Sequence, residues 1–267
     1  MTNQIPSGEP PLGALACPEP EDRPDLWPTT ARRTPDGELA LGGLTVSEIL
    51  ADAPSPVFVL DEADLRGRAA SWSAAMAEEF WSGYGLRGGE AFYAGKAFLT
   101  TQVARIVLQE GMGIDTASRV ELAVGLAGLE KVDGPEATTH ARRLGLHGNG
   151  KTPAEVTTAV RHRVGHLVID SPEEVDHAVA AVHELRRSGD FGADERARVM
   201  VRLTTGIHAG GHEYISTAHE DQKFGLSVST GAARRAIDAI VAADELELAG
   251  LHSHIGSQIL DMAGFRE

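Results

Sequence analysis

A strand and a helix meet in the segment HLVIDSPEE, residues 166–174. Residues 166–170 are β-prone and mostly apolar, which predicts a strand. Ser171, Pro172 and the two glutamates that follow are typical of the start of a helix, which we expect to continue to Arg187. The segment therefore predicts a strand that leads directly into a helix.

The same strand-to-helix unit recurs on both sides of this segment. The predicted strands are 91–94, 112–115, 144–147, 166–170, 199–203 and 246–254, and the predicted helices are 63–80, 100–109, 118–129, 153–163, 171–187 and 230–243. Such alternation predicts a parallel sheet with crossover helices. Both a doubly wound sheet and a (β/α)8 TIM-type barrel satisfy it.

Polar residues at the ends of the predicted strands favour the barrel. Lys96, Asp115, His147, Asp170 and His254 fall at or just past the carboxyl ends of successive strands. A barrel gathers such residues on one face, whereas a doubly wound sheet concentrates them at one switch point. About six strand–helix units are visible, the last without its helix, and a closed barrel needs about eight. We therefore expect an α/β fold with an incomplete barrel.

The chain before the barrel divides into two parts. Residues 1–40 are rich in Pro, Gly, Asp and Glu, which predicts a poorly ordered extension. Residues 57–60 (VFVL) follow two prolines and predict a short strand within the segment 41–60. Asp61 then offers an N-cap for the first long helix, so the barrel region is expected to span 61–267.

Composition excludes several classes of protein. The chain has 267 residues, with 24 Lys and Arg against 39 Asp and Glu, a formal net charge of −15. Nucleic-acid phosphates and anionic membranes would repel it. Cys17 is the single cysteine, no apolar run approaches a membrane span, and the N-terminus lacks the pattern of a signal peptide. We expect a cytoplasmic protein that binds neither nucleic acid nor membrane.

Lys96 is the first candidate for chemistry. It follows an apolar strand in the segment FYAGKAF, and the only other lysines are Lys131, Lys151 and Lys223. Burial would disfavour the ammonium form and make the amine available for a Schiff base, a role that Arg cannot take. The alternative is a lysine whose amine extends from the strand end into solvent.

Two histidines at the end of the last strand form a second candidate site. His252 and His254 alternate along the strand, so they project to the same side. They could bind a metal, as in hydrolases built on this barrel, or stack on an aromatic cofactor. Gly256 and Ser257 follow, where backbone N–H groups and a hydroxyl can reach a phosphate. The alternative is a core histidine followed by a glycine turn.

Three further segments follow predicted strands. Asp115 lies at a strand end, and Asn149 lies between two glycines in HGNGK, residues 147–151, which permits close approach to a ligand. The loop 206–226 is long and rich in His, Gly and Glu, which is typical of a lid. His208 and His212 within it have metal-ligand spacing, but no regular helix is predicted there.

Six motifs in order carry a family resemblance. FYAGKAF, GIDTASRVELA, HGNGK, HLVIDSPEEVD, STAHEDQKFGLS and GLHSHIGSQI resemble the diaminopimelate decarboxylase family, within the pyridoxal-phosphate enzymes of the alanine-racemase and ornithine-decarboxylase fold type. The resemblance runs from about residue 41 to residue 267 and is greatest to actinobacterial members. HGNGK departs from the frequent HGNNK by one residue.

The resemblance implies roles for individual residues. Lys96 matches the lysine that bonds to pyridoxal phosphate, and His254 matches the histidine that stacks on the pyridine ring. Gly256 and Ser257 match the turn that touches the phosphate. Asp115 and Asn149 match positions near the cofactor. No metal is implied.

The resemblance also implies an activity and an assembly. Family members convert meso-2,6-diaminopimelate to L-lysine and CO2, the last step of lysine biosynthesis. They are homodimers with a β-rich second domain, to which residues 41–60 would contribute the first strand. The later phosphate loop and substrate residues of the family have no counterpart here, so we expect this chain to be an N-terminal portion. The alternatives are an ornithine or arginine decarboxylase, a non-catalytic pyridoxal-phosphate-binding barrel, and a metal hydrolase.

Overall fold

The structure is a computed structural model that describes residues 18–53, 55–83, 85, 87–204, 224–256 and 266. Its internal contacts divide the chain into two units, Met1–Arg68 and Ala69–Glu267. The larger unit carries the sheet and the candidate residues. In the described part of the chain, no helix is both long and apolar enough to cross a membrane.

The larger unit is built on a parallel sheet. Its strands are β4 (Phe92–Ala94), β5 (Gly113–Thr116), β6 (Leu144–Leu146), β7 (His166–Ile169), β8 (Ala197–Thr204) and β10 (Leu246–Ser253). They lie in the order β10-β8-β7-β6-β5-β4, every neighbouring pair is parallel, and the short β9 (Leu226–Ser227) pairs with β8. The predicted parallel sheet is confirmed, and each predicted strand overlaps an observed one.

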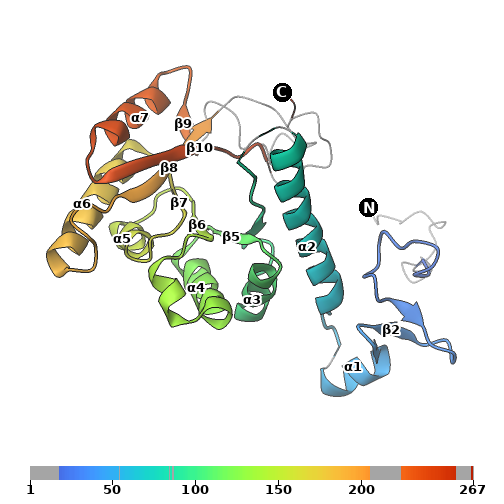
Figure 1. Ribbon diagram of the computed structural model, residues 1–267. Helices are drawn as coiled ribbons and strands as arrows, with labels where there is room; N and C mark the ends of the chain where they lie inside the picture. The colour runs from blue at the N-terminus through green and yellow to red at the C-terminus, as the bar shows by residue number, and fades with distance from the viewer. Residues whose placement is uncertain are drawn as a thin grey trace, which may run out of the picture. The chain divides into compact units, whose positions relative to one another are not determined.

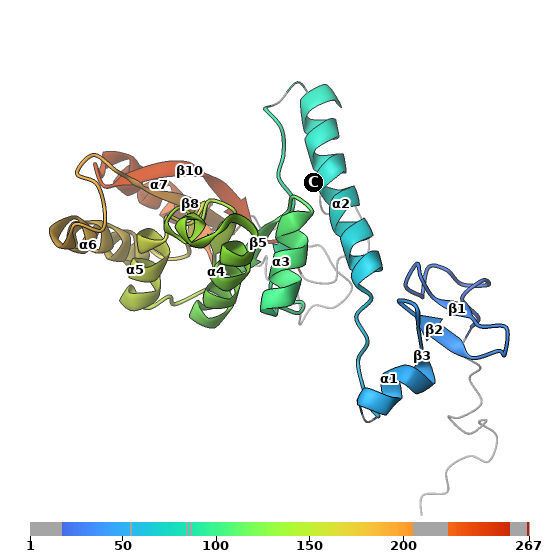
Figure 2. The ribbon, with the colours of Figure 1, turned by 60° about the horizontal axis from the view of Figure 1, so that its bottom comes forward.

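Helices cover the outer side of this sheet. They are α3 (Thr101–Gln109), α4 (Arg119–Asp133), α5 (Pro153–Arg161), α6 (Pro172–Ser188) and α7 (Ala232–Ala242), with a 3₁₀ helix, η3 (Pro135–Thr139), after α4. Figures 1 and 2 show α3 to α7 following one another along that side. Side chains of Thr100, Ser118 and Thr152 cap three of these helices, as short polar side chains do at N-caps.

The core lies between the sheet and these helices. Fully buried apolar side chains come from the strands (Ile114, Leu144, Leu146, Leu167 and Ile169) and from the helices (Ile106, Leu108, Leu122, Leu185 and Ile240). Strands that alternate with helices bury their outer face in this way, and the other face of the sheet remains for an interior.

The sheet curls around that interior. β4 and β10 are at opposite ends of the strand order, yet residues of both line one cavity of about 750 Å³ together with residues of β5, β7 and β8. The rings of His147, after β6, and His252, on β10, stack with centroids 6.3 Å apart, although β7 and β8 separate their strands. A flat sheet would not bring these strands together. The structure therefore confirms the predicted incomplete barrel.

The smaller unit is antiparallel where it forms a sheet. β1 (Arg32–Arg33), β2 (Leu39–Leu41) and β3 (Leu44–Thr45) pair in that order, and a capping box of Thr45 and Glu48 begins α1 (Val46–Asp52). The predicted poorly ordered extension thus contains folded structure from residue 18 onward. The indole of Trp27 donates to the Pro18 carbonyl at 2.8 Å, and Arg33 pairs with Glu19 at 2.7 Å. These long-range contacts order a stretch whose composition alone predicts none, and residues 1–17 lie outside the described part.

Asp61 begins the long helix as expected. Its Oδ1 accepts from the N–H of Asp64 at 2.9 Å, and the hydroxyl of Thr30 donates to its other oxygen. The helix, α2 (Glu62–Glu78), continues as a π-helical turn, η2 (Glu79–Gly83).

The predicted strand at 57–60 is wrong for this structure. These residues have no strand assignment, and the side chain of Phe58 is fully exposed. A strand forms only where a neighbour accepts and donates its backbone hydrogen bonds, and none of the described strands pairs with this segment.

Candidate functional site

The carboxyl ends of the parallel strands bring most of the predicted residues to one face. Asp115 lies on β5, and its Oδ2 contacts Nε2 of His147 at 3.0 Å. The stacking of His147 on His252 extends this contact across the interior. His254 follows directly after β10, and Lys96 follows after β4.

The pKa values of His252 and His254 are affected by charged side chains on neighbouring strands and at the other end of the sheet. Burial, followed by the positive charge of the nearby Arg202 guanidinium, lowers the pKa of His252 to about 4. Burial also lowers the pKa of His254 to about 4, with the positive charge of Lys96 as the next contribution. His252 and His254 are thus neutral at pH 7, and His254 lies within electrostatic reach of Lys96.

Lys96 is exposed, so of the two alternatives left open by the sequence the buried side chain is not observed. β4 is the terminal strand of the described sheet, and the residues just past it have no neighbouring strand on one side. Phe98, an apolar neighbour in the same segment, is also exposed, and its carbonyl accepts from the hydroxyl of Tyr93 at 2.7 Å. The structure therefore places the side chain of Lys96 at the surface of the described chain.

Glycines bring the backbone close to the carboxylate of this face. A Cβ on Gly145 of β6 would lie 3.2 Å from Oδ1 of Asp115. Gly148 has a φ of +117°, and a Cβ there would lie 3.2 Å from the carbonyl oxygen of Ala117. The turn therefore needs glycine at 148. Asn149 is exposed within this turn, beside the pair of Asp115 and His147.

The phosphate-contact turn is described only at its first residue. Gly256 is half-buried and has a φ of +151°, whereas Ser257 lies outside the described residues. The predicted lid lies almost wholly outside them as well, with His208, His212 and Lys223.

Arg202 is the residue that sequence reasoning missed. It lies on β8 directly opposite His252, it is buried, and its Nη1 is 3.5 Å from Oδ1 of the buried Asp170. Its guanidinium also lies 4.8 Å from the ring centroid of Phe224. Burial raises the pKa of Asp170, and the charge of Arg202 opposes that change. The sequence holds one signal for this residue. Arg202 follows Met200 by two positions on an otherwise apolar strand, so the two side chains lie on the same face of the sheet.

A comparison with known families classifies the domain that carries this face. The model of the family described as "Pyridoxal-dependent decarboxylase, pyridoxal binding domain" matches residues 63–267. The chain belongs to this family.

Individual relatives of this pyridoxal-dependent decarboxylase domain agree. Diaminopimelate decarboxylase of Mycobacterium tuberculosis is 41% identical over 242 residues, which cover 91% of this chain and 48% of the relative. The Bacillus subtilis enzyme of the same name is 34% identical over 236 residues, 88% of this chain and 48% of the relative. The chain thus spans about half the length of the curated relatives that it matches.

A solved structure supports the same architecture. The crystal structure of a diaminopimelate decarboxylase from M. jannaschii superposes with a TM-score of 0.73 at 24% identity, covering 89% of this chain and 50% of that one. At this identity the likeness establishes the fold of the decarboxylase domain and nothing finer.

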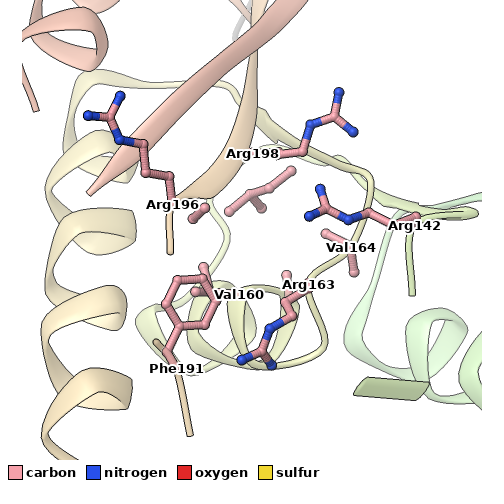
Figure 3. A pocket seen from close by; sticks show the side chains of 10 residues that line it. Arg142, Val160, Arg163, Val164, Phe191, Arg196 and Arg198 are labelled. Carbon is pink, nitrogen blue, oxygen red and sulfur yellow. The ribbon is translucent and has the colours of Figure 1, made fainter. Parts of the chain in front are cut away.

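The opposite end of the decarboxylase domain has a smaller pocket of different character. It lies at the amino ends of β7 and β8 and is lined by apolar side chains and four arginines (Figure 3). Arg163 is fixed there by Glu195, with Nη2 2.9 Å from Oε2, and by the ring of Phe191, 4.7 Å away. The guanidinium groups of Arg196 and Arg198 point to different sides, so they do not converge on one ligand.

No metal site is formed by the described part of the domain. No group of three or more His, Cys, Asp or Glu side chains gathers there in a way that could hold an ion. His252 and His254 instead lie beside Arg202 and Lys96, whose positive charges disfavour a cation.

Proposed function

We propose that the protein containing this chain decarboxylates meso-2,6-diaminopimelate to L-lysine and CO2, with pyridoxal phosphate as cofactor. The observation that carries the proposal is the approach of Lys96 and His254 from opposite ends of the curled sheet, beside Asp115. The identity of 41% to a diaminopimelate decarboxylase supports the choice of substrate within the family.

The residues of this face fit pyridoxal phosphate. Lys96 offers an accessible amine, and the half-buried imidazole of His254 offers an aromatic plane nearby. Nδ1 of His252 is buried and has no hydrogen-bond partner in the part of the chain the structure describes, so it leaves one polar contact for a ligand. Bound pyridoxal phosphate supplies an electron-withdrawing ring that stabilises the negative charge left as CO2 departs.

Each residue has a defined task in this proposal. The amine of Lys96 would hold the cofactor, and the exposure of this side chain leaves access for a substrate. The imidazole of His254, neutral at pH 7, would face the ring without adding charge, and Gly256 and Ser257 would hold the phosphate. Asp115 is oriented by its contact with His147, and Asn149 lies in the adjoining turn. The family resemblance in the motifs supports these assignments.

The proposal includes the organisation of the complete protein. We infer that residues 41–60 belong to the beginning of a β-rich second domain, with the barrel from residue 61 onward. The full exposure of Phe58 supports this, because an apolar β-prone segment of that kind gains stability by pairing with further strands. A cytoplasmic homodimer that takes a small amino acid as substrate completes the proposal, and the segment 206–226 is its proposed lid.

The cofactor assignment is tested by trapping with borohydride. The chain is incubated with pyridoxal phosphate, reduced and digested, and the modified lysine is located by mass spectrometry. We expect label on Lys96, loss of that label in Lys96→Arg, and no loss in Lys131→Arg, which changes an exposed lysine on α4. Equal labelling of Lys96, Lys131 and Lys151 would contradict the assignment.

The substrate assignment needs the complete gene product. Its turnover is measured by CO2 release from meso-2,6-diaminopimelate, ornithine and arginine. We expect diaminopimelate to give the highest kcat/KM. Faster turnover of ornithine or arginine would replace the proposed substrate, and cofactor binding without any CO2 release would favour a non-catalytic barrel.

A further inference from the structure

A buried ion pair joins the two loops that follow β6 and β7. Nζ of Lys151 lies 2.7 Å from Oε2 of Glu174, and their side chains are 4% and 2% exposed. Lys151 ends the HGNGK turn, and Glu174 lies in the first turn of α6.

The carboxylate of Glu174 accepts hydrogen bonds from backbone N–H groups in addition to its ion pair with Lys151. Its Oε1 accepts from the N–H of Lys151 at 3.1 Å, and its Oε2 accepts from the N–H of Asp170 at 2.8 Å. Nζ of Lys151 in turn donates to the carbonyl of Gly148 at 2.8 Å. Four interactions thus fix both ends of the turn 148–151 to the loop after β7.

We propose that Lys151 and Glu174 are positioning residues, which hold the turn 147–151 so that His147 remains on Asp115 and the turn remains beside the cofactor. This inference rests on the proposed function. A compact ammonium with three donors can serve Glu174 and Gly148 together, whereas a planar guanidinium is larger and fixed in shape.

The free energy of folding alone does not explain why a buried ion pair occupies this position. Two charges lose their hydration on burial, and an apolar pair of similar volume often folds as well or better. The pair supplies what an apolar pair does not, which is acceptors for the N–H groups of Lys151 and Asp170 and a donor for Gly148. The expected consequence of its loss is therefore a displaced turn rather than an unfolded barrel.

The test separates positioning from stability by means of a double variant. We would compare Glu174→Gln, the double variant Lys151→Met with Glu174→Leu, and the control Glu195→Gln, which breaks an ion pair at the opposite end of the strands. Three quantities are measured for each: the Tm, the Kd for pyridoxal phosphate, and hydrogen exchange of the amides of Lys151 and Asp170.

We expect the double variant to keep a Tm near that of the parent chain but to bind pyridoxal phosphate on the order of tenfold more weakly, with faster exchange of both amides. Glu174→Gln should lose affinity and Tm together, and Glu195→Gln should lose Tm alone. A double variant with the parent's affinity and exchange rates would overturn the proposal.

Two results keep this test distinct from that of the proposed function. If the parent chain binds no pyridoxal phosphate, the proposed function fails, and amide exchange alone then decides the role of the pair. If the double variant does not fold, Glu174→Gln decides it. Unchanged exchange at Lys151 and Asp170 in that variant, with a lowered Tm, would overturn the positioning role.

Discussion

Acidification should destabilise the barrel unit before its carboxylates with a lowered pKa titrate. The folded structure lowers the pKa of His252 and of His254 to about 4, and burial lowers the pKa of His166 as well. The pKa of histidine in an unfolded chain is about 6.5. The unfolded state therefore binds more protons between these values, so the stabilisation is present above pH 6.5 and is lost as the pH falls toward 4.

The magnitude follows from the size of the shift. For His252, lowering the pKa from 6.5 to about 4 corresponds to about 3 kcal/mol in full, of which about 2 kcal/mol is lost between pH 7 and pH 5. His254 is less buried, and solvent screening reduces its contribution to about 1 kcal/mol. Carboxylates with a lowered pKa, such as Glu195, lose their contribution only below this range.

The assay is urea denaturation of the cofactor-free chain at several pH values, followed by circular dichroism. We expect the free energy of unfolding to fall by about 3 kcal/mol from pH 7 to pH 5, and His252→Gln to remove about 2 kcal/mol of that fall. The control is His183→Gln, because His183 is largely exposed on α6. The reasoning is refuted if the parent and His252→Gln chains show the same dependence on pH.

Three substitutions test packing and backbone geometry in the barrel unit. A Cβ on Gly128 of α4 would lie 2.4 Å from Cβ of Ala104 on α3, so Gly128→Ala should destabilise the chain by about 1–3 kcal/mol in urea denaturation. Gly148→Ala should cost about 1–3 kcal/mol because of the positive φ, and should also weaken pyridoxal phosphate binding in a fluorescence titration. Arg163 has a φ of +50° yet binds Glu195, so Arg163→Ala should cost on the order of 2 kcal/mol in the same denaturation assay and leave cofactor affinity unchanged.

The parallel sheet could be predicted because its signals are local. Each strand is a short apolar run, and helices begin after capping residues such as Thr100 and Ser118. The apolar pattern and the capping residues therefore indicate the same boundaries of strands and helices. The meeting of Asp115 with His147 could be predicted for the same reason, since the carboxyl ends of parallel strands share one edge.

Features that depend on distant partners could not be predicted. The strands β1 to β3 are two or three residues long, and residues 57–60 have the composition of a strand without a partner in the described chain. The exposure of Lys96 follows from the place of β4 at the end of the sheet, which the local sequence does not specify. The pair of Lys151 and Glu174 joins residues 23 apart, one in the turn after β6 and the other in the first turn of α6.

A bulge on β10 determines which residue joins the site. Leu248 is opposite Val199 and Gly250 is opposite Met200, so one extra residue stands on β10 between these pairs. Side chains alternate along a strand, so this insertion exchanges the two faces of everything that follows. Without it, Leu251 would be opposite Arg202. With it, His252 takes that place and lines the interior cavity with Met200. The chemistry of this face therefore depends on a single backbone irregularity as much as on the identity of the histidine.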